Sequence, residues 1–216
     1  MSDRMAQELA EHREVAAAVV GVLPRARAVG ALLCAAYAAD ATLYTFGNGG
    51  SAADAQHLSG EMIGRYLRER RPLAAVTLST DPTVLTCIAN DYAFADVFSR
   101  QVRALVRPGD VVAAFTTSGR SPDVVEALRA AREQEATTVL FGGGDGGPAA
   151  EHADHALLVP STTTARIQEM HTFLLHAVSE VVDAWAAGES DPSSGPAAPA
   201  ADGLVRAGAA PAVVPR

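Results

Sequence analysis

From residue 42 onward, short apolar runs alternate with longer stretches in which apolar residues recur at helical spacing. The short runs predict five strands, and the stretches between them predict helices. The predicted strands span residues 42–46, 73–78, 110–115, 137–141 and 156–159. The predicted helices span residues 52–69, 82–89, 94–105, 122–134 and 164–187. Strands that alternate with helices in this way indicate an α/β fold, in which helices cover both faces of a parallel sheet.

The two ends of the chain differ from this alternating region. Residues 5–39 are rich in Ala, Leu, Val, Glu and Arg, and they predict a long helix, a break at Pro24 and a second helix. The C-terminal residues are mainly Ala, Pro, Gly and Ser, without sustained periodicity. We therefore expect a single domain over residues 1–187 and a flexible tail over residues 188–216.

The composition limits the class of protein. The 216 residues suffice for one domain with a large core, and the formal net charge of -8 argues against a nucleic-acid-binding surface. The N-terminal segment 1–14 has no apolar run long enough for a signal peptide or a membrane span. Cys34 and Cys87 lie far apart in apolar surroundings, which predicts buried thiols in a reducing compartment. The sequence therefore predicts a cytoplasmic protein with neither nucleic acid nor membrane as a partner.

The most specific feature is the segment Gly47–Ser51, Gly-Asn-Gly-Gly-Ser, which joins the first predicted strand to a predicted helix. A strand that leads through a glycine turn into a helix start directs backbone N–H groups and the positive end of the helix dipole at one point, which suits a phosphate. With Ala52, the turn also fits the dinucleotide fingerprint G-x-G-x-x-A. A dinucleotide site needs an acidic residue at the end of the second strand to bind the ribose. Here that strand ends in Leu-Ser-Thr, and Glu69 lies before the strand, which argues against this alternative. A nucleotide-binding P-loop is excluded, since the chain has no Gly-Lys-Ser/Thr sequence.

His57, Glu61 and Arg65 follow the glycine turn at four-residue intervals. Four residues make about one helical turn, so the three side chains are expected on one face of the predicted helix 52–69. A His and a Glu at this spacing commonly form a solvated pair, and alone they are weak evidence for a site.

A second set of polar residues lies on the last predicted helix. Gln168 and His176 are eight residues apart, which leaves them within about 80° of each other around the helix axis. With His57 and Glu61 they form a candidate four-ligand site for a divalent metal such as zinc. The carboxylate and an imidazole equally fit a general acid and base that work without a metal. His171 is expected to be a structural histidine or one that supports a ligand.

A second candidate phosphate loop, Thr116–Ser121, follows the third predicted strand. It offers hydroxyls and a glycine, and Ser121 is expected to cap a helix that begins at Pro122. In a parallel sheet both loops fall at the carboxyl ends of strands, where ligands bind. Hydroxyls and N–H groups without an obligatory Lys suit a sugar phosphomonoester. Asn90 and Asp91 are predicted to form a turn near the same edge, where they could hold sugar hydroxyls.

Four segments resemble, in order and in spacing, the phosphoheptose isomerases, which are sugar isomerase (SIS) domain enzymes. The segments are Gly47–Tyr66, Asn90–Asp91, Thr116–Ser121 and Arg166–His176. The match covers roughly residues 5–187, and only the tail falls outside it. The resemblance implies an activity, the conversion of sedoheptulose 7-phosphate to D-glycero-D-manno-heptose 7-phosphate.

The resemblance also implies a structure and a site. It implies a three-layer, flavodoxin-like α/β fold with a five-stranded parallel sheet and an N-terminal helical extension. It further implies a homotetramer with active sites at subunit interfaces and Glu61 and His176 as the catalytic pair. The implied zinc ligands are His57, Glu61, Gln168 and His176. The implied substrate-binding residues, with Arg65 added from the shared helix face, are Asn48, Gly49, Gly50, Ser51, Glu61, Arg65, Asn90, Asp91, Thr116, Thr117, Ser118, Ser121 and Gln168.

Three residues depart from the family pattern: Arg120 stands where many members have Asn, Thr116 replaces a common Ser, and Ala165 stands where some members have an acid. None of these changes removes a proposed ligand or catalyst. In an enediol mechanism, we expect Glu61 to transfer the proton between the two carbons and His176 to transfer protons between the oxygens. The reverse assignment stays open. SIS domains also serve as sugar-phosphate sensors or as partners of the replication initiator protein, and neither role needs this pair. A third possibility is an SIS enzyme that acts on an amino-sugar phosphate.

Overall fold

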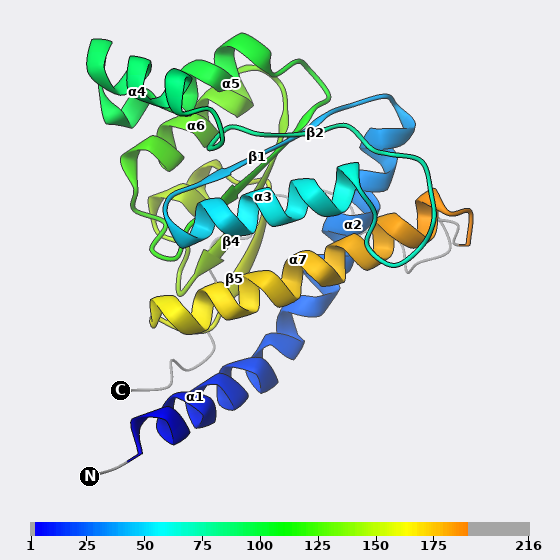
Figure 1. Ribbon diagram of the computed structural model, residues 1–216, viewed down its shortest axis with the longest axis vertical. Helices are drawn as coiled ribbons and strands as arrows, with labels where there is room; N and C mark the ends of the chain where they lie inside the picture. The colour runs from blue at the N-terminus through cyan, green and yellow to red at the C-terminus, as the bar shows by residue number, and fades with distance from the viewer. Residues whose placement is uncertain (1–2, 190–216) are drawn as a thin grey trace.

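The computed structural model describes residues 3–189, and a five-stranded parallel sheet lies at its centre (Figure 1). The strands are β1 Leu43–Gly47, β2 Ala75–Thr77, β3 Val111–Phe115, β4 Thr137–Gly143 and β5 His155–Val159. Their order in the sheet is β2-β1-β3-β4-β5, and each neighbouring pair is parallel. This is the flavodoxin-like order, which confirms the predicted fold class. The order reverses between β1 and β3, and ligands of open α/β sheets bind at such a switch point.

Helices cover both faces of this sheet. They are α1 Arg4–Ala18, α2 Leu23–Ala38, α3 Gly50–Ile63, α4 Pro82–Asp91, α5 Ser99–Leu105, α6 Pro122–Glu133 and α7 Thr164–Ala186, with 3-10 turns η1 Val19–Val22, η2 Phe94–Asp96 and η3 Pro148–His152. α2, α3 and α7 form one layer, and α4, α5 and α6 form the other. α1 projects beyond the sheet and carries the N-terminus at its free end (Figure 1). The result is a three-layer molecule with two cores, one on each side of the sheet.

The three central strands, β1, β3 and β4, bury both of their faces, which explains their short and continuous apolar sequences, whereas the edge strand β2 leaves Val76 exposed. Leu43, Val111 and Phe141 belong to the core beneath α2, α3 and α7, whereas Phe46 and Leu140 belong to the opposite core. Every residue of β1 and β3 is buried. Because both faces are covered, each strand needs apolar residues at nearly every position rather than at alternating ones.

The predicted helix 52–69 is too long. α3 ends at Ile63, since the backbone of Gly64 leaves the helical region with φ -78° and ψ -110°. Arg65 therefore lies in a loop, and the expectation that it shares a helix face with the two polar residues before it is wrong. A glycine near the end of a helical pattern is a recognised stop signal, and it outweighs the polar periodicity here.

Three further boundaries differ from the prediction. Pro24 lies in the first turn of α2, where a missing N–H costs little, and the change of helix type occurs before it at η1. α4 continues to Asp91, so Asn90 and Asp91 end a helix and do not form a turn. The predicted helix 94–105 is divided into η2 and α5.

The cysteines and the tail also bear on the sequence predictions. Cys34 is buried as predicted, but Cys87 is exposed, because α4 buries its neighbour Ile88 instead. The predicted flexible tail lies, from residue 190 onward, outside the described residues. The domain boundary at residue 187 stays a prediction.

One helical stretch of the described chain, Arg4–Ala38, is long and apolar enough to cross a membrane by length and composition. The core helix of a folded domain has the same properties. Val19, Val29 and Leu33 from this stretch are buried in the core, and α2 packs along α7. This packing accounts for the apolar residues of α2, whereas most side chains of α1 are exposed.

Candidate active site

The glycine turn lies at the carboxyl end of β1 and leads directly into α3. Gly47 admits no side chain, since a Cβ there would lie 2.7 Å from the backbone oxygen of Ser51 and 2.8 Å from that of Phe115. Gly49 has a φ of 55°, which residues with a side chain rarely adopt. α3 then begins at Gly50 without a side-chain cap. The N–H groups of Ser51 and Ala52 donate to the carbonyl oxygens of Asn48 and Gly49, at 3.0 and 3.1 Å. Within residues 3–189, the N–H groups of Gly49 and Gly50 have no acceptor, so these two are left for a ligand such as a phosphate.

The hydroxyl loop, Thr116–Ser121, lies at the carboxyl end of the neighbouring strand β3. Thr116 is buried, and its Oγ1 accepts a hydrogen bond from the N–H of Gly119 at 3.2 Å. Ser121 is the N-cap residue of α6, as predicted, but its side chain makes no cap bond. Its hydroxyl and that of exposed Ser118 can therefore donate to a ligand.

Asn48 and Asp123 connect these two loops. Nδ2 of Asn48 donates to Oδ2 of Asp123 at 2.7 Å, and Asp123 is buried in the first turn of α6. Burial raises the pKa of Asp123, and the hydrogen bond from Asn48 opposes that shift. The bond fixes the Asn48 amide with its nitrogen toward Asp123, which leaves the amide oxygen to accept from a sugar hydroxyl.

α3 and α7 lie side by side and run in the same direction (Figure 1). They are parallel because each follows a strand of the same parallel sheet, β1 and β5. Contacting residues therefore advance together along both helices. The contacts in order are Gln168 against Gly50, Thr172 Oγ1 with Asp54 Oδ1 at 3.2 Å, and His176 Nε2 with His57 Nε2 at 3.2 Å.

His57, Glu61 and His176, the triad, converge where the two helices meet. Nε2 of His57 lies 3.0 Å from Oε1 of Glu61 and 3.2 Å from Nε2 of His176. One candidate ligand atom from each residue lies within 4.8 Å of those from the other two. Two imidazole nitrogens and a carboxylate oxygen are a donor set that zinc prefers. The structure thus brings three of the four predicted metal ligands together.

The surroundings of the triad favour a neutral His176. Burial lowers the pKa of His176, and the neighbouring His57 lowers it further, while the charge of Glu61 opposes both. A neutral imidazole can accept a proton or bind a metal at neutral pH. The side chains of His57 and Glu61 are 39% and 17% exposed, so a small ligand can reach them.

Within residues 3–189, the amide of Gln168 makes no hydrogen bond with the triad. Its amide packs against Gly50, where an added Cβ would lie only 2.4 Å from Nε2 of Gln168. Gly50 precedes His57 by two helical turns, or about 10 Å along the axis. The structure thus brings Gln168 to the glycine turn, and its place in the metal-ligand set stays a prediction.

Asp54 and His171 form a second pair, which is buried, between the same two helices. His171 is fully buried, and its Nε2 lies 3.2 Å from the carbonyl oxygen of Gly142. A carbonyl only accepts hydrogen bonds, so this nitrogen carries the proton, and Nδ1 faces Oδ2 of Asp54 at 3.9 Å. Burial lowers the pKa of His171 to about 4, and burial raises the pKa of Asp54. His171 therefore packs as a structural histidine, which is one of the two roles that the sequence predicted.

Three residues near the site were not predicted as site residues. Asp54 lies one turn before His57 on the same face of α3, a spacing that the sequence makes visible. Asp123 starts α6, but nothing in the local sequence indicates its bond to the glycine turn. Tyr66 stacks on His176 with ring centroids 5.3 Å apart and 26° between the planes, and no sequence pattern predicts that contact.

Asn90 and Asp91 lie on α4, in the layer opposite α3 and α7, and Arg65 lies in the loop after α3. At the exposed end of α4, Nδ2 of Asn90 donates to Oδ1 of Asp91 at 2.8 Å. Arg65 is exposed, and its Nε lies 3.8 Å from a carboxylate oxygen of Glu69. Within residues 3–189, none of the three shares a hydrogen bond or an ion pair with the triad. Their roles in substrate binding stay predictions.

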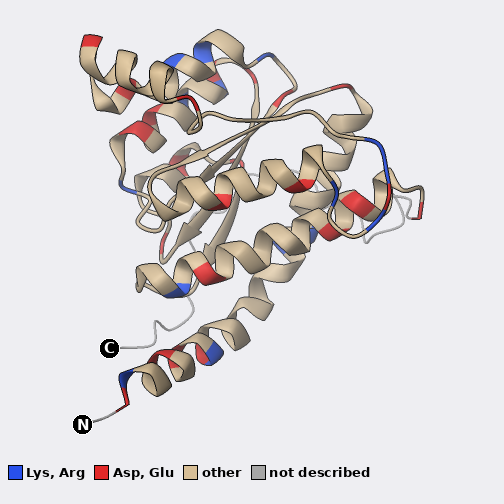
Figure 2. Cartoon of the chain, viewed as in Figure 1, with Lys and Arg blue, Asp and Glu red and all other residues tan. Residues whose placement is uncertain are grey.

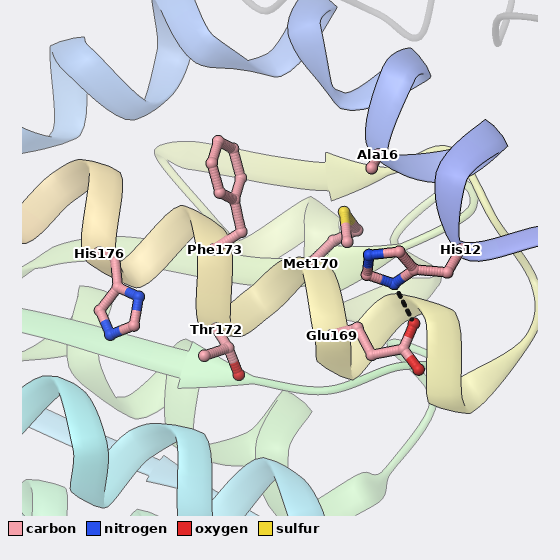
Figure 3. Close-up of a pocket in the computed structure, with 7 residues that line it drawn as sticks. All are labelled: His12, Ala16, Glu169, Met170, Thr172, Phe173 and His176. Carbon is pink, nitrogen blue, oxygen red and sulfur yellow. Dashed lines mark hydrogen bonds and ion pairs between the residues drawn. The ribbon is translucent and has the colours of Figure 1, made fainter. Parts of the chain in front are cut away.

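An open hollow of about 370 Å³ lies between α1 and α7 (Figure 3). His176 and Thr172 line it on the side that faces α3, and Phe173 points toward α1. At the other end, Nδ1 of His12 lies 2.8 Å from Oε2 of Glu169 and joins the two helices. Because His176 lines this hollow, a small molecule there could reach its imidazole.

Known proteins are similar to this chain in sequence and in fold. The SIS domain family matches residues 23–143. The phosphoheptose isomerase of Paramagnetospirillum magneticum is 48% identical over 183 residues, which cover 84% of this chain and 95% of that relative. Phosphoheptose isomerase 1 of Campylobacter jejuni is 43% identical, over 85% of this chain and 98% of that relative. The solved phosphoheptose isomerase of Neisseria gonorrhoeae is 42% identical, with a TM-score of 0.79 over 84% of this chain and 98% of that chain. The chain therefore belongs to the phosphoheptose isomerases of the SIS-domain family.

Proposed function

We propose that this protein is an aldose–ketose isomerase that converts sedoheptulose 7-phosphate to D-glycero-D-manno-heptose 7-phosphate. The observation that carries the proposal is the convergence of a carboxylate and two imidazoles, from α3 and α7, on the helix that begins at the glycine turn. Family membership over 84% of the chain supports the same activity. A sugar-phosphate sensor needs the phosphate loops but not this group of side chains.

The carboxylate and an imidazole divide the proton transfers between them. Glu61 removes the proton from the carbon next to the ketone and returns it to the neighbouring carbon, through an enediol. Neutral His176 moves the proton between the two oxygens, which its lowered pKa permits. No atom is gained or lost, because the substrate takes back one proton at carbon and one at oxygen for those it gives up. The proton held by Glu61 can exchange with water before it is returned.

The glycine turn and the hydroxyl loop hold the phosphate end of the sugar. Both lie at the switch point between β1 and β3, and the Asn48–Asp123 hydrogen bond connects them. N–H groups and hydroxyls bind an anion locally, which suits a protein with a net charge of -8. Binding of the phosphate far from the reacting carbons orients those carbons toward the triad.

The triad also fits a divalent metal, and we propose zinc. His57, Glu61 and His176 would hold the ion, with Gln168 as the predicted fourth ligand. The donor set of two imidazoles and one carboxylate supports zinc over magnesium or calcium, which prefer oxygen ligands. When bound, the metal supplies a Lewis acid that polarises the sugar carbonyl and stabilises negative charge on its oxygen.

We further propose a cytoplasmic homotetramer with active sites at the subunit interfaces. Exposed apolar side chains flank the hollow: Met5 and Leu9 on α1, and Phe173 on α7. Side chains of this kind favour burial against another copy of the chain. Light scattering after gel filtration tests the proposal, and a mass four times 22.3 kDa is expected.

Hydrogen exchange at carbon tests the enzymatic proposal. Sedoheptulose 7-phosphate is incubated with the protein in deuterated water, and the sugar is followed by NMR. An isomerase incorporates deuterium at the carbon next to the carbonyl and forms the aldose, whereas a sensor binds without exchange. Glu61→Gln serves as the matched control, and it is expected neither to incorporate deuterium nor to form the aldose. Binding by the wild-type protein without exchange would establish the sensor instead.

A further inference from the structure

The loop that follows α3, residues 64–72, is held against the C-terminal half of α7, and we call it the strap. The backbone N–H groups of Tyr66, Leu67 and Arg68 all donate to the carboxylate of Asp183, at 3.3, 3.0 and 2.7 Å. The Asp183 side chain is only 1% exposed. Three N–H donors on one buried carboxylate fix the backbone of the strap at these residues.

Arg70 extends the same contact to the end of α3. Its guanidinium is 0% exposed, and Nε lies 3.2 Å from Oδ1 of Asp183. Its terminal nitrogens donate to the carbonyl oxygens of Glu61 and Met62. These carbonyls lie in the last turn of α3, where intrahelical partners are missing and a cation is favourable. The buried ion pair therefore joins the strap, α7 and the helix end that carries Glu61.

The charges of this region are arranged accordingly. Figure 2 shows positive residues along the strap and negative residues on the adjacent part of α7. Arg68 adds an outer contact, a bidentate pair with Glu180 at 2.9 and 3.0 Å. Glu180 is partly exposed, so this outer pair is weaker than the buried one.

The strap places an aromatic ring on one of the two catalytic side chains. The ring of Tyr66 stacks on the imidazole of His176, with centroids 5.3 Å apart. The ring of His57 meets the same imidazole edge on, at 4.8 Å. The last side-chain torsion of a histidine is broad and soft, so contacts on the ring decide its orientation. Tyr66 and His57 together restrict that rotation.

We propose that Tyr66 is a positioning residue for His176 and that the Asp183–Arg70 ion pair holds it in place. The strap acts on both members of the catalytic pair, through the ring of His176 and through the backbone carbonyl of Glu61. The inference rests on the proposed function, since it takes His176 as the group that moves the oxygen protons. The positioning role requires the flat ring of Tyr66 and does not require its hydroxyl.

Substitutions at Tyr66 distinguish the effect of the aromatic ring from the effect of the side-chain volume. Tyr66→Phe keeps the ring and is expected to keep kcat within about two-fold. Tyr66→Leu fills much of the space without a ring, and kcat is expected to fall about ten-fold or more while KM changes less than about three-fold. Glu180→Gln removes the outer ion pair of the strap and serves as the matched control, with wild-type kinetics expected. Asp183→Asn loses the carboxylate that holds the strap, and it should lower kcat in the same way as Tyr66→Leu.

An NMR measurement on free protein gives a readout that does not depend on turnover. A stacked aromatic ring shifts the C–H protons of the His176 imidazole upfield, and a His176→Gln variant assigns those signals. The shift is expected in the wild-type protein and in Tyr66→Phe, and it is expected to vanish in Tyr66→Leu. Thermal unfolding identifies any variant that fails to fold, and Tyr66→Leu, on a partly exposed loop, is expected to fold.

The outcomes separate the inference from the proposed function. A Tyr66→Leu protein that loses the upfield shift but keeps the wild-type kcat overturns the positioning role and leaves the isomerase proposal intact. An equal fall of kcat in Tyr66→Phe would assign the effect to the hydroxyl and also overturn it. A wild-type protein that converts no sedoheptulose 7-phosphate refutes the proposed function, whatever the NMR signals show.

Discussion

The triad and the buried pair Asp54–His171 lie between the same two helices, and each combines a histidine from α7 with a carboxylate from α3. Their exposure differs: the side chains of His57 and Glu61 are 39% and 17% exposed, and that of His171 is 0% exposed. In the buried pair a backbone carbonyl holds one ring nitrogen, and the pKa of His171 is about 4. A buried neutral imidazole serves to pack the helices, whereas a partly exposed one can exchange protons with a ligand. Burial, and not residue type, therefore separates the two roles.

The largest effect is expected from Glu61→Gln, in the triad. The amide keeps the shape of the side chain but accepts no proton, so kcat is expected to fall about 10³-fold or more. The free energy of unfolding in urea is expected to change by less than about 1 kcal/mol, because Glu61 is partly exposed. Glu69→Gln, at a side chain that is 93% exposed, is the matched control and should keep wild-type turnover. Undiminished turnover in Glu61→Gln would remove the triad from the chemistry.

The buried pair is expected to affect stability, and the effect depends on pH. The ordinary pKa of histidine is 6.5, and that of His171 in the folded protein is about 4. As the pH falls through this window, the unfolded chain binds a proton that the folded protein excludes. The free energy of unfolding therefore decreases as the pH falls below about 6.5, by about 3 kcal/mol at pH 4. Above pH 6.5 the imidazole is neutral in both states, so His171 adds no pH dependence there.

Urea unfolding at several pH values measures this loss. The wild-type protein is compared with His171→Asn, which has no titrating ring. The difference in the free energy of unfolding between the two proteins is expected to shrink as the pH falls from about 6.5 to about 4. A difference that stays constant over this range would show that His171 titrates normally in the folded protein.

These two regions also show what the sequence could and could not predict. The apolar runs predict a covered parallel sheet, and such a sheet brings the ends of β1 and β3 together. It also makes α3 and α7 parallel, so that His57 and His176 could be expected to meet. The local sequence does not reveal burial, because it depends on the neighbours of a helix in space. The exposed Cys87 and the buried Asp54 illustrate this.

The end of α3 shows a second limit of sequence reasoning. The polar spacing of His57, Glu61 and Arg65 predicts one continuous face, but Gly64 ends the helix. The strap that follows is fixed by Asp183, more than a hundred residues away in the chain. No local pattern encodes such a contact, because both partners are single residues whose pairing depends on the completed fold.

Zinc affinity sharpens the contrast between the triad and Gln168. Titration of metal-free protein with zinc in a calorimeter is expected to show a loss of about 100-fold in affinity for His57→Ala. Gln168→Ala is expected to lose about ten-fold or less, because its amide lies beside Gly50 at the glycine turn. Equal losses in the two variants would place Gln168 in the ligand set on the same footing as the triad.

Two glycines of α3 give the smallest and most local test. An added Cβ at Gly50 would lie 2.4 Å from Nε2 of Gln168, whereas one at Gly60 would have no neighbour within 4 Å. Gly60→Ala should stabilise the helix by up to about 1 kcal/mol and leave the kinetics unchanged. Gly50→Ala must displace the Gln168 amide from the start of α3, where the phosphate of the substrate is expected to bind.

We expect Gly50→Ala to raise the KM for sedoheptulose 7-phosphate about ten-fold, or about 1.4 kcal/mol of binding. Its kcat should change less, because the triad lies two turns further along the helix. Steady-state kinetics and thermal unfolding of the two variants measure both effects. If Gly60→Ala raises KM as much as Gly50→Ala does, the rigidity of α3 as a whole controls binding. If only Gly50→Ala does so, the glycine turn binds the substrate while the triad transforms it.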